Sequence, residues 1–201
     1  SPLSLIVSAF APLRDTSKAI TPQIDLKSHQ STELIFIDLA KGNKRMGGSI
    51  VSQITSQLIG PVPDVECVEE MPGLVKVLHR LIKQGKILSY HDRSDGGLIC
   101  TFVEMAFAGR SGLDIYLDQI CKSENEILKS LFNEELGIII QVPSECNKEV
   151  IDLINSIGMK GWHAGMLANS AAVEAMTSVL ISINKHHSIS HSGIKVTGLK
   201  D

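Results

Sequence analysis

The hydrophobic and polar positions of the chain follow two periods, and each period predicts a set of secondary-structure elements. Short apolar runs rich in β-branched and aromatic residues predict strands at residues 3–12, 33–40, 86–90, 113–117, 136–142, 162–167 and 173–183. Apolar residues at helical spacing predict helices at residues 48–58, 72–84, 98–108, 123–131 and 146–157. This alternation is typical of an α/β fold with a mixed sheet and packed helices, in which segments 162–167 and 173–183 could pair as antiparallel strands.

A dense polar cluster, residues 91–97, separates the strand predicted at 86–90 from the helix predicted at 98–108. It contains the carboxylates of Asp92 and Asp95, the guanidinium of Arg93 and the hydroxyl of Ser94, followed by a glycine pair. In open α/β sheets such strand-to-helix turns bind ligands, and the start of a helix attracts anions. The cluster therefore indicates metal and phosphate chemistry.

A purely structural interpretation exists for part of this cluster. Asp95 could cap the following helix by accepting hydrogen bonds from its first free amides, while the glycines form the turn. That interpretation explains Asp92, Arg93 and Ser94 poorly. Ser94 does not look like an acyl-transfer nucleophile, because the Gly-x-Ser-x-Gly pattern is absent.

A second glycine-rich loop, residues 41–49, follows the strand predicted at 33–40 and opens a helix. Its basic side chains and free amides could receive a phosphate, so Gly47, Gly48 and Ser49 are candidate nucleotide-binding residues. The loop lacks the Gly-Lys-Ser/Thr ending of a Walker loop. The alternative is a glycine turn with solvated basic residues.

The polar cluster, together with residues 104–109 (Glu-Met-Ala-Phe-Ala-Gly), resembles the large phosphoribosylformylglycinamidine synthase family of purine biosynthesis. Residues 1–10, 41–49 and 132–137 are similar to further landmarks of that family, and together they cover residues 1 to about 170 in family order. The resemblance is to the second carboxy-side synthetase subdomain, and it implies the fold of the C-terminal domain of aminoimidazole ribonucleotide synthetase.

The resemblance also implies a reaction and its cofactors. Such ligases use ATP and glutamine-derived ammonia to convert formylglycinamide ribonucleotide to its amidine. By this resemblance Asp92 is a Mg²⁺ ligand, Ser94 contacts ATP or ADP, and Arg93 and Asp95 are phosphate or supporting partners. No catalytic residue is assigned.

The same resemblance implies that residues 1–201 are one domain of a longer polypeptide. The family's amino-side synthetase domains and its glutaminase domain have no counterpart in the chain, and they are the expected partners. The isolated chain is therefore expected to be inactive. Two other hypotheses stay open: a structural module whose nucleotide is auxiliary, and a different synthetase-superfamily enzyme such as a phosphate kinase.

The composition is that of a globular domain, and it argues against a nucleic-acid-binding protein and against a membrane protein. The 201 residues are 43% hydrophobic and 20% charged, which is enough for one domain with a substantial core. A net charge of -3 without a basic run argues against nucleic acid. There is no uncharged apolar run of about 18 residues and no basic leader, so the chain is expected in the cytoplasm rather than in a membrane.

The cysteines, the histidines near the end of the chain and three glutamates carry weaker signals. The spacing of the cysteines fits neither a zinc site nor a disulfide framework, and we expect reduced, buried thiols at Cys67, Cys100, Cys121 and Cys146. Solvated loop positions are expected for the histidines near the end of the chain, His186, His187 and His191. The sequence leaves open whether Glu134 and Glu135 form an exposed charge pair or contact a substrate, and it assigns no role to Glu104.

Overall fold

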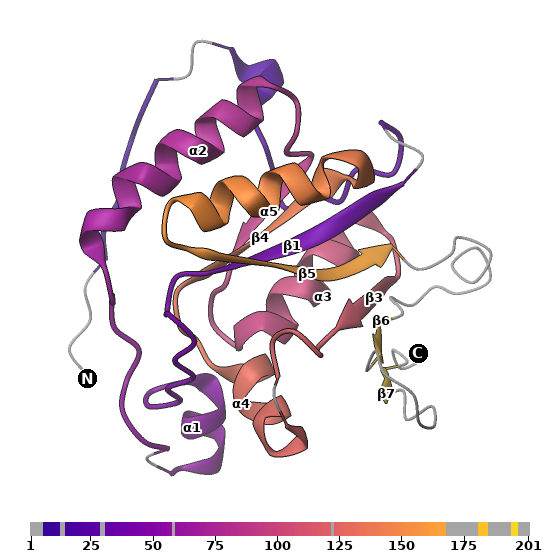
Figure 1. Ribbon diagram of the computed structural model, residues 1–201. Helices are drawn as coiled ribbons and strands as arrows, with labels where there is room; N and C mark the ends of the chain where they lie inside the picture. Colours follow the sequence, from indigo (N-terminus) through magenta and orange to yellow (C-terminus); the bar gives the residue numbers. More distant parts are fainter. Residues whose placement is uncertain are drawn as a thin grey trace.

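The central strand of the sheet, β1 (Thr32–Asp38), is apolar along most of its length, and such a strand must be covered on both faces. The computed structural model describes residues 6–12, 15–28, 31–57, 59–121, 123–167, 181–184 and 194–196 (Figure 1). In it β1 lies between two antiparallel neighbours, β4 (Gly137–Pro143) and β5 (Lys160–Leu167). The other strands are β2 (Ser89–Asp92), β3 (Leu113–Tyr116), β6 (Ile181–Asn184) and β7 (Ile194–Val196).

The strands form one sheet in the order β2-β4-β1-β5-β3-β6-β7, and the β3–β6 pair is parallel while the other pairs are antiparallel. The predicted mixed sheet is therefore confirmed. Because β1 and β2 both run antiparallel to β4, and β3 and β1 both run antiparallel to β5, strands β1, β2 and β3 point the same way. Their carboxyl ends meet the amino ends of β4 and β5 at one edge, which we call the loop edge.

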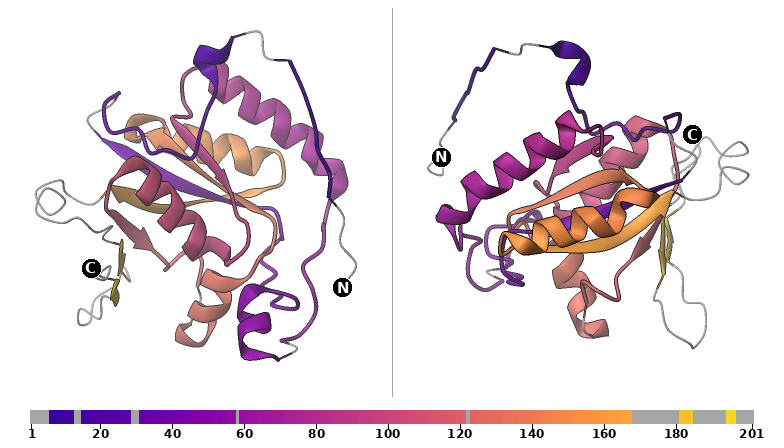
Figure 2. Two further views of the ribbon diagram at one scale, coloured as in Figure 1. Left: turned by 180° about the vertical axis from the view of Figure 1, so that it is seen from behind. Right: turned by 45° about the horizontal axis from the view of Figure 1, so that its top comes forward.

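Helices cover both faces of the sheet (Figures 1 and 2). Alternate residues of a strand point to opposite faces. Accordingly Leu34 and Phe36 of β1 join the core beneath α3 (Gly97–Gly109) and α4 (Ile127–Phe132), whereas Ile35 and Ile37 join the core beneath α2 (Met71–Lys83) and α5 (Asn147–Ser156). The two cores hold the sheet between two helical layers.

Shorter elements complete the description. Helix α1 (Ile50–Thr55) follows the loop after β1, and single 3₁₀ turns lie at Thr16–Lys18, Val68–Glu70, Glu124–Glu126 and Ser144–Cys146. The predicted helices at 48–58, 123–131 and 146–157 therefore exist, with short 3₁₀ turns before the last two. The strand predicted at 86–90 is shifted and ends at Asp92. None of the helices in the described part of the chain is long and apolar enough to cross a bilayer.

Two expectations about strands are wrong. Residues 6–12 of the segment predicted as strand 3–12 form no strand, and their large apolar side chains are exposed, with Phe10 at 95%. Residues 1–5 lie outside the described residues. Strand propensity reflects the fit to a neighbouring strand and a packed face, and residues 6–12 have neither.

The expected antiparallel pairing of segments 162–167 and 173–183 is also wrong for residues 181–183, the part of the second segment that the structure describes. Both edges of β5 are used, one by β1 and the other by β3. Strand β6 pairs instead with β3 and β7, and residues 173–180 lie outside the described residues.

The core beneath α3 provides a stability test. Phe102 is fully buried, whereas its neighbour Val103 is 39% exposed. Phe102→Ala should lower the free energy of unfolding by about 3–5 kcal/mol because it leaves a cavity, and Val103→Ala should lower it by less than about 1 kcal/mol. Urea unfolding of both variants measures this difference. Equal losses would contradict the assignment of these two side chains to core and surface.

Candidate functional site

The loop edge is organised by residues 133–137, which lead from the end of α4 to the first residue of β4. The carboxylate of Glu134 accepts hydrogen bonds from two backbone amides, Ile50 N and Gly96 N, each at 2.9 Å. These amides lie at the start of α1 and immediately before α3. A carboxylate is stabilised at the amino end of a helix by the partial positive charge there. Glu134 thus ties the loop after β1 to the turn after β2.

Its neighbour Glu135 is fully buried and forms an ion pair with Arg45. One carboxylate oxygen accepts from Arg45 Nε at 2.6 Å and from Arg45 N at 2.9 Å, and the other accepts from Nη2 at 2.8 Å. This contact raises the pKa of Arg45 above its ordinary value. The two glutamates therefore act as internal acceptors that fix the loop residues, and they do not form an exposed charge pair.

Arg93 points into the protein, and its side chain is only 3% exposed. Its Nε donates to the carbonyl of Glu135, its Nη2 donates to the carbonyl of Leu136 at 2.9 Å, and the guanidinium lies 5.1 Å from the centre of the Phe36 ring. Burial lowers the pKa of Arg93 to about 10. Arg93 therefore anchors the polar turn to the start of β4.

The glycine pair serves close packing at the same place. Gly97 has a φ of +77°, and a Cβ there would lie 2.6 Å from the carbonyl oxygen of Leu131 and 2.7 Å from that of Asn133. Gly96 is the residue that precedes α3, and no side chain caps this helix. The alternative in which Asp95 caps the helix is therefore wrong.

The two sequence candidates that lie beside Arg93 face solvent. Asp92 is exposed at the end of β2, and its Oδ1 accepts a hydrogen bond from the Tyr90 hydroxyl at 2.5 Å. Burial and this bond raise the pKa of Tyr90 above its ordinary value. Ser94 is exposed as well. The turn thus presents a carboxylate and a hydroxyl to solvent, while the buried side chain of Arg93 fixes the turn through its hydrogen bonds to the carbonyls of Glu135 and Leu136.

The three candidates in the loop after β1 differ in accessibility. Gly47 is buried, and its amide donates to Pro61 O at 2.8 Å. Ser49 is buried too: its amide donates to Met46 O at 3.2 Å, and its hydroxyl caps α1 by accepting from Ser52 N at 3.2 Å. Gly48 is exposed and has a φ of +74°. Most of the loop's polar backbone is therefore already used inside the protein.

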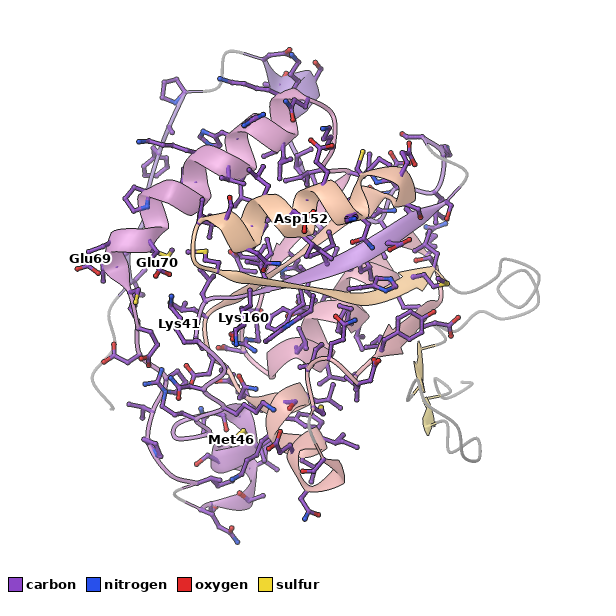
Figure 3. The ribbon with its side chains drawn as sticks, in the orientation of Figure 1. Lys41, Met46, Glu69, Glu70, Asp152 and Lys160 are labelled. Carbon is purple, nitrogen blue, oxygen red and sulfur yellow. The ribbon has the colours of Figure 1, made fainter. Side chains whose placement is uncertain are left out.

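A cavity of about 200 Å³ opens at the loop edge and is not evident from the sequence. Its lining comes from β1, β5, α4 and the loops that connect the elements at this edge, and it combines aromatic, basic and polar side chains, including Phe36, Lys41, Arg93, Ser130, Lys160 and Trp162. Figure 3 shows Lys41 and Lys160 near each other at this edge. The sequence gives one hint of this cavity, because Phe36 and Asp38 are two positions apart on β1 and so share a face. It does not show which residues of other elements complete the lining.

Three remaining groups of residues have limited roles in the described structure. The carboxylate of Glu104, to which the sequence assigned no role, forms a hydrogen bond with His91 Nε2 at the protein surface, at 2.8 Å. The four cysteines form no disulfide and are half-buried, which corrects the expectation of full burial, and burial raises the pKa of Cys100. Within the described residues no group of three or more His, Cys, Asp or Glu side chains could hold a metal ion. The three candidate histidines, His186, His187 and His191, lie outside those residues.

Comparison with known proteins places this fold in a family. The family model for AIR synthase related protein, C-terminal domain, matches residues 39–176. The chain belongs to this family. The AIR synthase related C-terminal domain described here is also 42% identical over 162 residues to phosphoribosylformylglycinamidine synthase of Schizosaccharomyces pombe, which confirms the resemblance stated above. That alignment spans 80% of this chain but only 12% of the relative.

Solved structures support the fold of this AIR synthase related C-terminal domain. PurL of T. maritima in complex with FGAR matches 85% of this chain and 28% of its own length, with a TM-score of 0.64 and 11% identity. HypE of E. coli, a hydrogenase maturation protein, matches 89% of this chain and 51% of its own length, with a TM-score of 0.50 and 15% identity. At these identities the likeness shows a shared fold.

The Glu134 contacts can be tested by substitution. Glu134→Ala removes the acceptor of two backbone amides and should lower the free energy of unfolding by about 2–3 kcal/mol, because hydrogen bonds to a charged group are worth about 1.5–3 kcal/mol. Glu69→Ala is the control, since Glu69 is exposed in the 3₁₀ turn before α2 and should change stability by less than about 0.5 kcal/mol. Chemical denaturation compares them, and equal stability of the two variants would refute the role of Glu134.

Proposed function

We propose that this chain is a domain of a phosphoribosylformylglycinamidine synthase, a carbon–nitrogen ligase of purine biosynthesis. The observation that carries the proposal is the 42% identity over 162 residues to the S. pombe enzyme. In the proposed reaction, ATP activates the amide oxygen of formylglycinamide ribonucleotide and glutamine-derived ammonia displaces it. The chain spans 12% of that relative, so the amino-side synthetase and glutaminase domains of the same polypeptide would be its partners.

The proposed contribution of this domain is a magnesium–nucleotide site at the turn after β2. Asp92 would be a Mg²⁺ ligand and Ser94 a nucleotide contact, because both side chains are exposed and adjacent beside the start of α3. Magnesium is usually held in nucleotide sites by one or two carboxylates, with phosphates and water completing its shell. One exposed aspartate fits that requirement. Bound Mg²⁺ would neutralise the charge of the nucleotide phosphates.

The other proposed site residues would act in different ways. Arg93 would position the turn from inside the protein, since its Nε and Nη2 donate hydrogen bonds to backbone carbonyls. In the loop after β1, the exposed Gly48 would let a phosphate approach the backbone, while Gly47 and Ser49 would keep the loop in shape. Location in the cytoplasm stays a prediction.

A second function is favoured by one specific observation. The amide of Ile50 and the amide of Gly96 already bind the carboxylate of Glu134, which takes the position that a ligand's anionic group would occupy. This arrangement favours a structural domain whose nucleotide is auxiliary and stabilises the larger assembly. The two functions differ in whether loss of the nucleotide site lowers turnover or only stability.

A chimaera tests the proposed identity. The segment of the S. pombe enzyme that aligns with this chain would be replaced by this chain, and amidine formation from formylglycinamide ribonucleotide, ATP and glutamine would be measured. We expect turnover within about tenfold of the parent enzyme, a loss of at most about 1.4 kcal/mol in transition-state stabilisation. A folded chimaera without activity would contradict membership of this enzyme.

The Asp92 assignment is tested in the same chimaera. Asp92→Asn should weaken Mg-ADP binding by roughly tenfold to more than a hundredfold, because a lost charged contact costs about 1.5–3 kcal/mol. Asp152→Asn is the matched control, since Asp152 is an exposed aspartate on α5, away from the turn after β2. Calorimetric titration measures both affinities, and an unchanged affinity for Asp92→Asn would remove the assignment. Turnover of the variant then separates a catalytic site from an auxiliary one.

A further inference from the structure

The cavity at the loop edge borders the turn after β2 through Arg93, but neither Asp92 nor Ser94 lines it. One wall is an aromatic pair from neighbouring strands, Phe36 and Trp162, which oppose each other in the β1–β5 register with ring centres 5.7 Å apart. Asp38 and Lys160 oppose each other two residues along the same strands, so they share that face of the sheet. Helix α4 and the loop at residues 119–120 contribute the other side.

The cations that line the cavity are not equivalent. Three of them face carboxylates of the protein: Lys41 with Glu70 at 2.6 Å, Lys44 with Glu126 at 2.8 Å and Arg93 with Asp38 at 3.9 Å. The side chain of Lys160 is exposed, and its ammonium group makes no hydrogen bond or ion pair with the side chains of the described residues. Lys160 is therefore the positive charge that this part of the protein leaves available to a ligand.

Ser130 provides an independent sign of a missing partner. Ser130 lines the cavity, the residue is only 1% exposed, and its Oγ has no hydrogen-bond partner among the described residues. Buried hydroxyl groups in proteins are nearly always paired, because an unpaired one loses its hydrogen bonds to water without replacement. The nearby Asn133 does not satisfy it, since its side-chain amide donates to the backbone carbonyls of Lys129 and Ser130.

We propose that this cavity binds a small phosphate monoester with a hydroxyl-bearing carbon skeleton. Lys160 would pair with the phosphate, Ser130 would exchange a hydrogen bond with a ligand hydroxyl, and the skeleton would lie against Trp162. The size supports a small ligand, because drug-sized molecules usually occupy cavities of about 300–1,000 Å³. The site does not rest on the proposed magnesium–nucleotide site or on the proposed enzyme.

The chain carries its own reporter for this cavity, because Trp162 is its single tryptophan. The 201-residue chain would be titrated with glycerol 3-phosphate while tryptophan fluorescence is recorded. We expect a saturable change with glycerol 3-phosphate and none with glycerol at equal concentration. A fluorescence signal that does not change, or one that glycerol reproduces, would overturn the proposal.

Substitutions locate the binding. Lys160→Glu should weaken binding at least about tenfold, whereas Lys76→Glu, at an exposed lysine on α2, should leave it unchanged. Ser130→Ala should weaken binding roughly twofold to tenfold with an unchanged or raised melting temperature, since it removes an unpaired buried hydroxyl. Equal affinity of the Lys160→Glu and Lys76→Glu variants, with both melting as the parent chain does, would overturn the assignment of the phosphate. Equal affinity of Ser130→Ala and the parent chain would overturn the role of Ser130.

Discussion

The contact between the Glu134 carboxylate and the amides of Ile50 and Gly96 determines the shape of the loop edge. Strand direction brings the loop after β1 and the turn after β2 to the same edge, but it does not fix their conformations. Glu134 does so by satisfying one amide from each. The ion pair of Glu135 with Arg45 and the hydrogen bonds of Arg93 to the start of β4 act in the same few residues. Residues 133–137 therefore link two helices, two loops and the sheet.

This arrangement decides where a ligand can approach. Internal acceptors already use the amides that begin α1 and precede α3, so an incoming phosphate finds most of the backbone donors occupied. Of the candidate site residues, Asp92 and Ser94 on the turn and Gly48 on the loop are exposed. These groups suit a metal-bridged phosphate better than one held by a cradle of amides. Asp92 and Ser94 do not line the cavity beside Lys160, which the turn borders only through Arg93.

The sequence predicted the elements better than the contacts between them. Periodicity located the helices and most strands, because each is encoded by residues close together in the chain, and the glycine pair after Ser94 correctly marked a strand-to-helix turn. The inward direction of Arg93 and the pairing of Glu135 with Arg45 depend on residues about 40 and 90 positions away, and no local pattern encodes them. The segment at 6–12 shows the opposite error, in which apolar composition predicted a strand without a neighbour.

Amide hydrogen exchange at Ile50 and Gly96 tests most directly whether Glu134 holds the loop edge together. The experiment compares the parent chain with a Glu134→Gln variant under conditions where both remain folded, and NMR follows the two amides individually. The account predicts that both amides are protected in the parent and that both exchange faster in the variant, while amides in the centre of β1 are unaffected. Fast exchange of either amide in the parent, or unchanged exchange in the variant, would contradict it.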